Sequence, residues 1–498
     1  MASETFQTKA IPKPAPGAGT GLFATTTIYP GFNVCDLPTS FATVLDSARL
    51  EDTCSNCFGV RSIKAESNLG EAANGLKLCT GCRTVRYCDR TCQVENWKAA
   101  HKYECAIYRD LYPKVLPVNS RAVMRLVLLR AVKRLSQKDI DIFEKDLQSH
   151  IKAIEQTNKE QFERLVLSAK AVHSYSKTDM HLNTIVDYFA KLEINSFNLT
   201  TPFHDRIGLC IQPYASFINH SCDPNAVVGF DQGRIFIKAL REIKSGEQVF
   251  ISYVDNTNPF ELRQKELLER YFFECTCPKC AMGTSAREDR FLVSQPDIPS
   301  LKEAEKNALE LLESAKRDSN PAAAIEKLKS SVKILQKTEV WPITRQPFVQ
   351  LRDELIASLI EGQQFGPAFI QSAIRYLRID PTVFPGTWHP LRNVHAWTLV
   401  KLAIHIFEDP NVANADTALI REYGINLGLI IYSVLSDLNK AEGELPTAEM
   451  TYKGNYIDVK KEFEANGLKP DTMKSEINAE WAKLEKLVND TLRGDIDM

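Results

Sequence analysis

The sequence lacks any apolar run long enough to cross a membrane. Its longest apolar stretch lies between Leu427 and Val434 and is interrupted by glycine, tyrosine and serine, whereas a membrane-spanning helix needs about 20 predominantly apolar residues. The first residues are polar and contain proline, so the apolar region of a secretion signal is also missing. We therefore expect no membrane contact and a location in the cytoplasm, the nucleus or both.

A large net charge is missing as well. The 61 Lys and Arg residues almost balance the 63 Asp and Glu residues, giving a formal charge of −2. Such a chain has no general electrostatic attraction to nucleic acid. The hydrophobic and charged fractions, 44% and 25%, are those of an ordinary globular protein. At 498 residues the chain has room for roughly two to four domains, each with its own core.

Cysteine, in contrast, is abundant and ordered. Eight potential metal ligands follow one another between Cys54 and Cys105, in four pairs with two or three residues between partners. This spacing lets two side chains reach one tetrahedral Zn²⁺ ion. One pair alone would equally fit buried cysteines that bind nothing, but four in succession predict two closed, structural zinc sites. The pairs are Cys54 and Cys57, Cys79 and Cys82, Cys88 and Cys92, and His101 and Cys105.

The charge of this cysteine-rich segment argues against nucleic-acid binding. Its eight basic residues exceed its five acidic ones by three. One zinc bound by four thiolates and one bound by three thiolates and a neutral histidine would offset that excess. Because Lys and Arg contacts to phosphate are the main source of affinity for nucleic acid, a protein-contact module is the better interpretation.

A third cysteine cluster lies further along the chain. Cys275, Cys277 and Cys280 would leave a zinc ion one ligand short, and Cys222 is the obvious candidate for the fourth. A structural turn with free thiols is the alternative. If the metal assignments hold, only Cys35 and Cys210 remain, and we expect them to be small buried residues.

The cysteine-rich segment resembles a MYND zinc finger, including the Tyr87-Cys88 step and Trp97 before the histidine. Spacing does not decide which pairs share an ion, but the resemblance implies interleaved sites. Cys54, Cys57, Cys88 and Cys92 would bind one ion, and Cys79, Cys82, His101 and Cys105 the other. The 21 residues between Cys57 and Cys79 exceed the family's usual gap and are predicted to form a polar surface loop.

Four further segments resemble parts of a SET domain. They correspond to its N-terminal glycine turn, its cofactor-binding core, its last strand with a tyrosine, and its post-SET zinc site. A SET signature interrupted by a MYND finger is the mark of the SET and MYND domain (SMYD) family of protein-lysine methyltransferases. The segments are Gly17-Ala18-Gly19-Thr20-Gly21-Leu22, Asn219-His220-Ser221-Cys222, residues 246–253 and residues 275–280.

This resemblance implies an α+β fold. A β-rich SET domain would be interrupted by the MYND finger and followed by a post-SET zinc site and an all-α, tetratricopeptide-like C-terminal domain. The implied boundaries are 8–50 for the N-terminal SET part, 54–105 for the finger, 106–254 for the SET domain with a helical insert at about 119–190, 255–282 for the post-SET segment and 299–498 for the helical domain.

The same resemblance implies a site for S-adenosyl-L-methionine. At the glycine turn, many relatives carry a basic residue where Ala18 stands and an Asn where Thr20 stands, so we expect backbone contacts there. A buried turn satisfied by Asn219 and His220 is the structural alternative. Phe273 matches an aromatic residue that packs on adenine. The implied cofactor-binding residues are Ala18, Gly19, Thr20, Asn195, Asn219, His220, Tyr253 and Phe273.

The implied catalytic residues are Tyr253 and Tyr271, which with Phe197 resemble the family's lysine channel. Methyl transfer from a sulfonium to an amine needs no covalent enzyme intermediate, so catalysis must come from positioning and electrostatics. A lysine ammonium must first lose its proton, and an apolar channel beside a cation lowers its pKa. Each tyrosine could instead be an ordinary core residue.

Helices are predicted over much of the remaining chain. Residues 119–190 show apolar periodicity that includes Leu165 and Leu167, with interruptions near Ser136 and at 157–158. The basic stripe Arg121, Arg125, Arg130, Lys133 and Arg134 is predicted to be a solvated face. C-terminal helices are predicted at 301–315, 322–336, 352–362, 369–378, 394–408, 418–438 and 474–493, with a polar connection that contains Glu442, Glu444, Pro446, Lys453 and Gly454.

Two functions are compatible with these patterns. The leading hypothesis is an S-adenosylmethionine-dependent protein-lysine N-methyltransferase that acts on histone or non-histone proteins, carries three Zn²⁺ ions and is a monomer. Protein partners are expected at the finger and at the helical C-terminal domain. The competing hypothesis is a MYND-type adaptor whose SET domain is inactive. The presence of Asn219, His220, Tyr253, Tyr271 and the third set of cysteines favours the enzyme.

Overall fold

The computed structural model describes residues 6–39, 41–59, 75–386, 389–408, 417–441 and 443–494. It divides into two compact units. The first comprises residues 1–253, 267–274 and 445–448, and the second comprises 254–266, 275–444 and 449–498. The loop predicted between Cys57 and Cys79 falls largely outside the described residues. Within the described ranges, no helix is long and apolar enough to cross a membrane.

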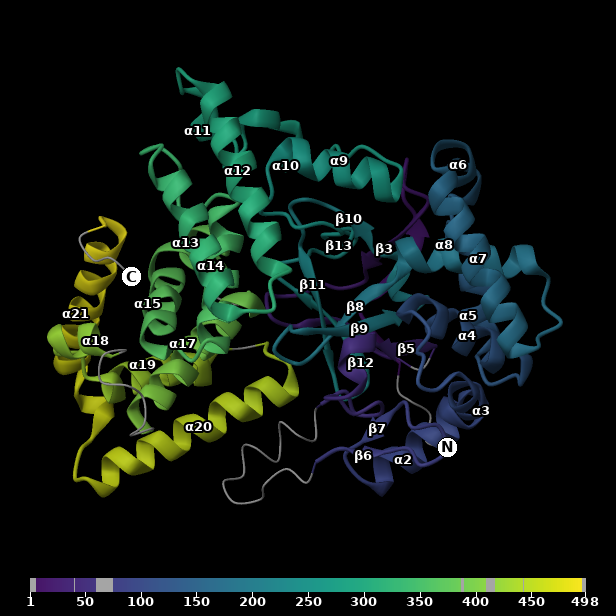
Figure 1. Cartoon of the computed structure of the whole chain (residues 1–498), viewed down its shortest axis with the longest axis horizontal. Coiled ribbons are helices and arrows are strands. Elements are labelled where there is room, and N and C mark those ends of the chain that lie inside the picture. Colours follow the sequence, from purple (N-terminus) through teal and green to yellow (C-terminus); the bar gives the residue numbers. More distant parts are fainter. Residues whose placement is uncertain are drawn as a thin grey trace. The chain divides into compact units, whose positions relative to one another are not determined.

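The first unit combines short strands with a set of helices (Figure 1). Its largest sheet has the order β1-β4-β12-β11, and a three-stranded sheet has the order β5-β9-β8. The pairs β2-β3, β10-β13 and β6-β7 complete the pattern. The strands are β1 Gln7–Thr8, β2 Ala10–Pro14, β3 Thr20–Ala24, β4 Asn33–Pro38, β5 Ala42–Leu45, β6 Lys77–Leu78, β7 Arg86–Tyr87, β8 Phe197–Thr200, β9 Arg206–Ile211, β10 Asn219–His220, β11 Ala226–Asp231, β12 Arg234–Ala239 and β13 Phe250–Ile251.

Local sequence explains two of these pairings. Gln232 and Gly233 both have positive φ angles, 50° and 74°, which suits the two-residue turn that joins β11 to β12. Gly208 lies where β9 meets β5, and a Cβ there would be 2.1 Å from the carbonyl oxygen of Val44. Only glycine therefore permits the two strands to approach this closely.

Most helices of the first unit lie, in sequence, between the cysteine-rich segment and β8. Ser136 and Asn158 accept hydrogen bonds from the helix N-termini they precede, which confirms the predicted interruptions. The prediction for Leu167 was wrong. It is 70% exposed, because it lies about 200° around the helix from buried Leu165. The helices are α2 Arg90–Asn96, α3 Lys102–Leu111, α4 Val118–Ala131, α5 Gln137–Asp141, α6 Ile151–Thr157, α7 Lys159–Ser176 and α8 Leu182–Asn195, with π-helical turns at Trp97–His101 and Ile142–Asp146.

Two members of the basic stripe also contradict the sequence-based interpretation. Arg121 is 3% exposed and donates to the carbonyl oxygens of Leu45 and Leu116. Arg125 pairs with Glu104. Helix α4 is apolar on most of its circumference, and its guanidinium groups enter the interior because backbone carbonyls and a carboxylate are present to receive them. Charge alone therefore did not mark a solvated face.

The second unit is helical. The predicted helices are present, but Gly424, with φ 61°, divides the predicted 418–438 helix in two. Most of the supposed polar connection is instead a long helix that contains Lys453 and Gly454, in which buried Ala448 and Tyr452 lie four residues apart on one face. The helices are α10 Pro278–Ala281, α11 Arg290–Val293, α12 Ile298–Lys316, α13 Pro321–Gln336, α14 Phe348–Glu361, α15 Phe365–Ile374, α16 Asp380–Val383, α17 Pro390–Glu408, α18 Ala418–Glu422, α19 Leu427–Lys440 and α21 Lys474–Leu492, while α9, Phe260–Tyr271, and α20, Pro446–Ala465, have residues in both units.

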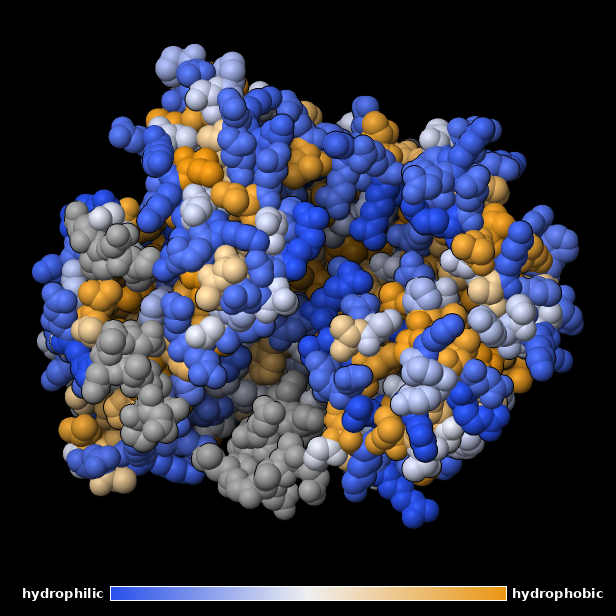
Figure 2. All heavy atoms as spheres, in the orientation of Figure 1, coloured by the Kyte–Doolittle hydropathy of each residue, from blue (hydrophilic) through white to orange (hydrophobic). Residues whose placement is uncertain are grey.

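The core of the first unit is continuous. Apolar side chains of the cysteine-rich segment, such as Tyr87, belong to the same buried cluster as Leu37 of β4 and Met124 of α4. Cys35 and Cys210 are buried in it, as predicted. The face of the molecule shown in Figure 2 is largely hydrophilic, with apolar residues in patches among polar ones, which is ordinary for a folded protein.

Candidate active site and metal centres

The glycine turn borders open space. Gly17 and Gly19 have φ angles of 74° and 68°, and a Cβ on either would meet no atom within 4 Å. The backbone N–H of Ala15 donates to the carbonyl oxygen of Gly19 at 2.7 Å and closes the turn immediately before β3. Backbone groups around Ala18, Gly19 and Thr20 are thus held in a fixed turn with room for a ligand beside it.

The Asn219 side chain joins this turn to a segment 199 residues away. Its amide nitrogen donates to the carbonyl oxygen of Thr20 at 3.2 Å. Asn219 belongs to β10, which pairs in parallel with β13 and places Asn219 beside Phe250. Two of the segments predicted to bind cofactor therefore meet in the structure.

Asn225 supports the same arrangement and was missed as a site residue. It is fully buried, accepts from the backbone N–H of Phe250 at 2.7 Å and donates to the carbonyl oxygen of Gln248 at 2.8 Å. These bonds fix the segment that leads into β13. Its place at the end of the same sequence stretch, Asn219 to Asn225, was the available signal.

His220 bridges a tyrosine and a cysteine. Its Nδ1 accepts the backbone N–H of Tyr253 at 2.9 Å, so its Nε2 carries the proton and donates to Sγ of Cys222 at 3.2 Å. Both ring nitrogens are therefore engaged within the protein, and the cofactor contact predicted for His220 is left to its backbone.

Tyr253 and Tyr271 lie together in an aromatic cluster. Their ring centres are 4.9 Å apart, and the Tyr271 hydroxyl donates to the carbonyl oxygen of Tyr253 at 3.4 Å. The Tyr253 hydroxyl donates to the carbonyl oxygen of Ile218 at 2.6 Å. His220 lies 5.2 Å from the Tyr253 ring and 5.9 Å from the Phe273 ring. Three segments predicted to form the site thus converge on one place.

The electrostatics of the cluster favour hydrogen-bond donors over bases. Burial, with a smaller contribution from Tyr271, raises the pKa of Tyr253 above its usual value. Tyr253 therefore keeps its hydroxyl proton at neutral pH. The Arg270 guanidinium lies over the Tyr271 ring, 5.2 Å from its centre. The cluster can orient a polar group, but Tyr253 does not supply a base.

The two remaining predicted residues lie at element ends. Asn195 is the last residue of α8, and its side-chain nitrogen donates to the carbonyl oxygens of Lys191 and Gln148 at 2.8 and 3.0 Å. Phe197 begins β8 opposite Cys210 and packs, half-buried, against the same core as Tyr253. The cofactor role of Asn195 and the channel role of Phe197 stay predictions.

The cysteine-rich segment brings its eight ligand atoms into two groups. In each group the ligand atoms lie within 4.8 Å of one another. Successive ligand pairs along the chain belong alternately to the two groups, so the sites are interleaved and not consecutive. One group is Cys54, Cys57, Cys88 and Cys92, and the other is Cys79, Cys82, His101 and Cys105. Mostly thiolate donors in sets of four fit Zn²⁺.

Glu104 connects the second group to the sheet. Its carboxylate is 1% exposed, lies 3.9 Å from Nδ1 of His101 and receives two hydrogen bonds from Arg125. Arg125 also donates to the carbonyl oxygen of Thr43 on β5. Burial opposes ionisation of Glu104, but Arg125 outweighs it and lowers the pKa to about 2. Glu104 is therefore charged and held beside His101 of the second metal group, where a carboxylate can orient the imidazole ring.

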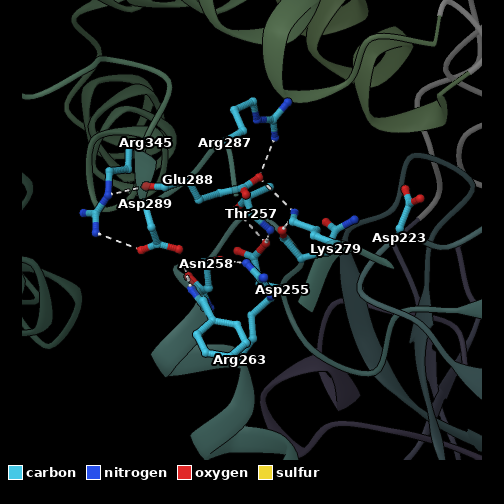
Figure 3. A network of polar contacts seen from close by, with 12 residues as sticks. Asp223, Asp255, Thr257, Asn258, Arg263, Lys279, Arg287, Glu288, Asp289 and Arg345 are labelled. Carbon is cyan, nitrogen blue, oxygen red and sulfur yellow. Dashed lines mark hydrogen bonds and ion pairs between the residues drawn. The ribbon is translucent and has the colours of Figure 1, made fainter. Parts of the chain in front are cut away.

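The third group contains Cys222, Cys275, Cys277 and Cys280, with sulfur atoms again within 4.8 Å of one another. Gln264 of α9 forms two hydrogen bonds with the backbone of Cys275, at 2.7 and 2.9 Å. Lys279, between two of the cysteines, pairs with buried Glu288 at 2.8 Å (Figure 3). Burial opposes the Glu288 charge, yet Lys279 lowers the pKa of this carboxyl group. The cysteine turn is thus anchored at two points.

Comparison with known proteins agrees with this geometry. Residues 19–254 match the family model described as "SET domain". "SET domain and MYND-type zinc finger protein 6" of Schizosaccharomyces pombe is 32% identical over 245 residues, which cover 49% of this chain and 46% of that protein. "Histone-lysine N-methyltransferase SMYD3" of Mus musculus is 26% identical over 345 residues, 66% of this chain and 76% of that protein. The match thus spans about half the length of the first relative.

Among solved structures, the SET domain of LSMT bound to lysine and AdoHcy aligns with 95% of this chain and 92% of its own at 13% identity. Its TM-score is 0.27, a value that supports no structural argument. The likeness to known proteins rests instead on the SET match and on the named relatives. Residues 19–254 match the SET domain, and the chain is similar along much of its length to proteins named for SET and MYND domains (SMYD).

Proposed function

We propose that this protein is an S-adenosylmethionine-dependent protein-lysine N-methyltransferase. The observation that carries the proposal is the meeting of the Asn219 side chain with the carbonyl oxygen of Thr20, next to the paired rings of Tyr253 and Tyr271. A cofactor turn beside a pair of tyrosines, one just after β13 and one at the end of α9, is what this chemistry requires. The relative named as a histone-lysine N-methyltransferase supports the same activity.

The residues present suit the cofactor. The turn at Gly17 and Gly19 offers backbone groups beside open space, into which no Cβ projects. We assign the methionine end to Ala18, Gly19 and Thr20, and the adenine to the ring of Phe273. Asn219 orders the turn from the opposite strand. S-adenosylmethionine, when bound, supplies an electrophilic methyl group on a sulfonium.

The tyrosines would orient the substrate amine. The substrate amine would lose one proton to solvent beforehand, and its lone pair would then take the methyl group that bound S-adenosylmethionine supplies, giving a methylated ammonium and the demethylated cofactor. The hydroxyls of Tyr253 and Tyr271 act as hydrogen-bonding groups, because burial keeps Tyr253 protonated. Their ring faces accommodate the amine and its methylated product. The rate therefore comes from positioning.

The three cysteine groups are assigned to three structural zinc ions. Each has four ligands, which leaves no coordination position for a substrate. The first two groups would form a MYND finger inserted after β5 of the SET domain. Its near-neutral charge makes a protein partner the better assignment than nucleic acid.

The helical second unit is proposed to be a tetratricopeptide-like domain. Its long helices follow one another through short connections, from α12 to α15, as in helix-hairpin arrays. We assign to it, together with the finger, the binding of protein partners, and we propose a monomer located in the cytoplasm, the nucleus or both.

The test uses the full-length protein, S-adenosylmethionine with a labelled methyl group, and a cell extract as substrate. We expect label on lysine side chains of particular proteins, which mass spectrometry identifies. Asn219→Ala should abolish most labelling by weakening cofactor binding by about 1–3 kcal/mol. Asn198→Ala, at an exposed position of β8, is the matched control and should label normally.

The competing function is an inactive adaptor. It predicts no lysine labelling, unchanged cofactor affinity in Asn219→Ala, and capture of proteins by the zinc-loaded finger. Wild-type protein that contains three zinc ions, binds extract proteins and transfers no methyl group would replace the enzyme proposal with the adaptor.

A further inference from the structure

One buried arginine in the second unit has contacts that no sequence motif predicted. Arg345 is 3% exposed. Its guanidinium carbon lies 4.5 Å from the ring centre of Trp341 and 4.9 Å from that of Phe291, so aromatic faces bound it. A buried cation is costly unless it is paired and hydrogen-bonded. The partners of Arg345 therefore show which segments of the chain its charge joins.

Those partners lie on two adjacent acidic residues and on α12. Nε of Arg345 donates to the backbone carbonyl oxygen of Glu288 at 2.6 Å, and one terminal nitrogen lies 3.7 Å from the Asp289 carboxylate. Another terminal nitrogen pairs with Glu305 of α12 at 2.8 Å. Figure 3 shows Arg345 facing Glu288 and Asp289. A planar fork of donors is suited to hold several acceptors at once.

Glu288 and Asp289 each contact a further segment of the chain. The Glu288 side chain pairs with Lys279, whose ammonium also donates to the carbonyl oxygen of Asn256 at 2.5 Å. The Asp289 carboxylate accepts the backbone N–H of Phe260 at 2.8 Å. Phe260 begins α9, so Asp289 satisfies one of the free donors at that helix N-terminus.

These two segments contain residues of the third metal group and of the tyrosine pair. Lys279 lies within the turn that contains Cys277 and Cys280 of the third metal group. Helix α9 contacts Cys275 through Gln264 and ends at Tyr271, whose ring pairs with that of Tyr253. One guanidinium thus touches the two residues that fix the start of α9 and the cysteine turn.

We propose that Arg345 is a positioning residue, which fixes the start of helix α9 and the cysteine turn at 275–280 of the third zinc site for methyl transfer. This inference rests on the proposed function for its kinetic consequence, but its effect on the zinc site is independent of it. Arg345 contacts neither zinc ligands nor the tyrosines, so it acts through Glu288 and Asp289.

The test compares two buried arginines of the same unit. Arg375 is 2% exposed and pairs with Asp380 at 3.0 Å and with Asp353 at 3.3 Å. Arg375→Met should therefore destabilise the helical unit much as Arg345→Met does. Only Arg345→Met should disturb the third zinc site. Arg345→Lys keeps the charge but loses the fork, and it should give an intermediate result.

Three measurements separate the outcomes. A chromogenic chelator should release one zinc equivalent of three about 10-fold faster from Arg345→Met, and at wild-type rate from Arg375→Met. Calorimetry should show S-adenosylmethionine affinity reduced only in Arg345→Met. On an identified substrate, kcat should fall by about 10-fold or more, with a smaller change in KM.

Equal zinc release from the two Met variants, at matched loss of unfolding free energy, would overturn the proposal and leave Arg345 a purely structural residue of the helical unit. Faster zinc release from Arg345→Met in a protein that transfers no methyl group would uphold the link to the zinc site and overturn only its kinetic part. If Arg345→Met does not fold, Arg345→Lys carries the same comparison.

Discussion

Nδ1 of His220 accepts the backbone N–H of Tyr253 at 2.9 Å, while the opposite ring nitrogen donates to Sγ of Cys222 at 3.2 Å. A ligand of the third metal site and a candidate catalytic residue are thus bonded to one imidazole. The relationship makes zinc binding and active-site geometry parts of one structure, although His220 itself ligates no metal.

Replacement of His220 by Gln should weaken the binding of the third zinc and the binding of cofactor together. A single Gln side chain cannot reproduce two bonds made from opposite edges of a rigid ring. We expect the third zinc to bind about 10–100-fold more weakly, and cofactor affinity to fall in parallel. Chelator-driven zinc release and calorimetry measure the two effects. Wild-type zinc retention with reduced cofactor affinity would show that the hydrogen bond from His220 to Cys222 does not strengthen zinc binding.

Tyr253→Phe should separate chemistry from binding. The ring and its packing remain, so we expect cofactor affinity near wild type, kcat lower by on the order of 100-fold, and a loss of stability of about 1 kcal/mol from the bond to Ile218. The measurements are initial rates on an identified substrate, calorimetry and denaturant unfolding. Undiminished kcat would remove the hydroxyl from the mechanism.

The pH dependence of the rate is set by the ionisation of the substrate amine, because Tyr253 stays protonated over the neutral range. The substrate ammonium, with a reference pKa of about 10.4, must lose its proton, so the reactive fraction grows as pH rises. Burial raises the pKa of Tyr253, so its hydroxyl does not ionise over the neutral range. We expect the rate to increase with pH in wild type and in Tyr253→Phe alike. A falling rate limb near neutral pH in wild type alone would contradict this assignment.

Glu104→Gln should loosen the second metal group. The amide keeps the size of the side chain but loses the charge that Arg125 and His101 face. We expect a zinc affinity about 10–100-fold lower at that site, with three equivalents of zinc present in wild type. Elemental analysis and chelator titration measure this. Glu95→Gln, exposed in the same segment, is the control and should retain zinc normally.

Gly208→Ala tests the pairing of β9 with β5. A Cβ at 2.1 Å from a backbone oxygen cannot be accommodated by a side-chain rotation, so we expect a destabilisation of at least about 1–3 kcal/mol. Gly454→Ala is the matched control, since its Cβ meets nothing within 4 Å in helix α20, and it should stabilise by roughly 0.5–1 kcal/mol. Denaturant midpoints compare the two variants, and equal midpoints would refute the close approach.

Features that depend on neighbouring residues could be predicted from the amino-acid sequence. Ligand pairs separated by two or three residues, such as Cys54 and Cys57, identify zinc sites because chain geometry alone brings both side chains to one ion. The helix interruption at Asn158 was predictable for the same reason, since a cap acts within one turn. The motifs around Gly19, Asn219 and Tyr253 likewise indicate the family without any knowledge of distant contacts.

Tertiary structure decided whatever depends on partners distant in the chain. The interleaved grouping of cysteines could not follow from spacing, because the spacing within a pair does not show which other pair shares its ion. Arg121 and Arg125 were placed on a solvated face because nothing in the sequence shows that Leu45, Thr43 and Glu104 receive them. The contacts of the His220 ring with Tyr253 and Cys222 likewise join segments that are distant in the chain. Burial of a charge or a polar ring is decided by long-range partners, and a local pattern carries no record of them.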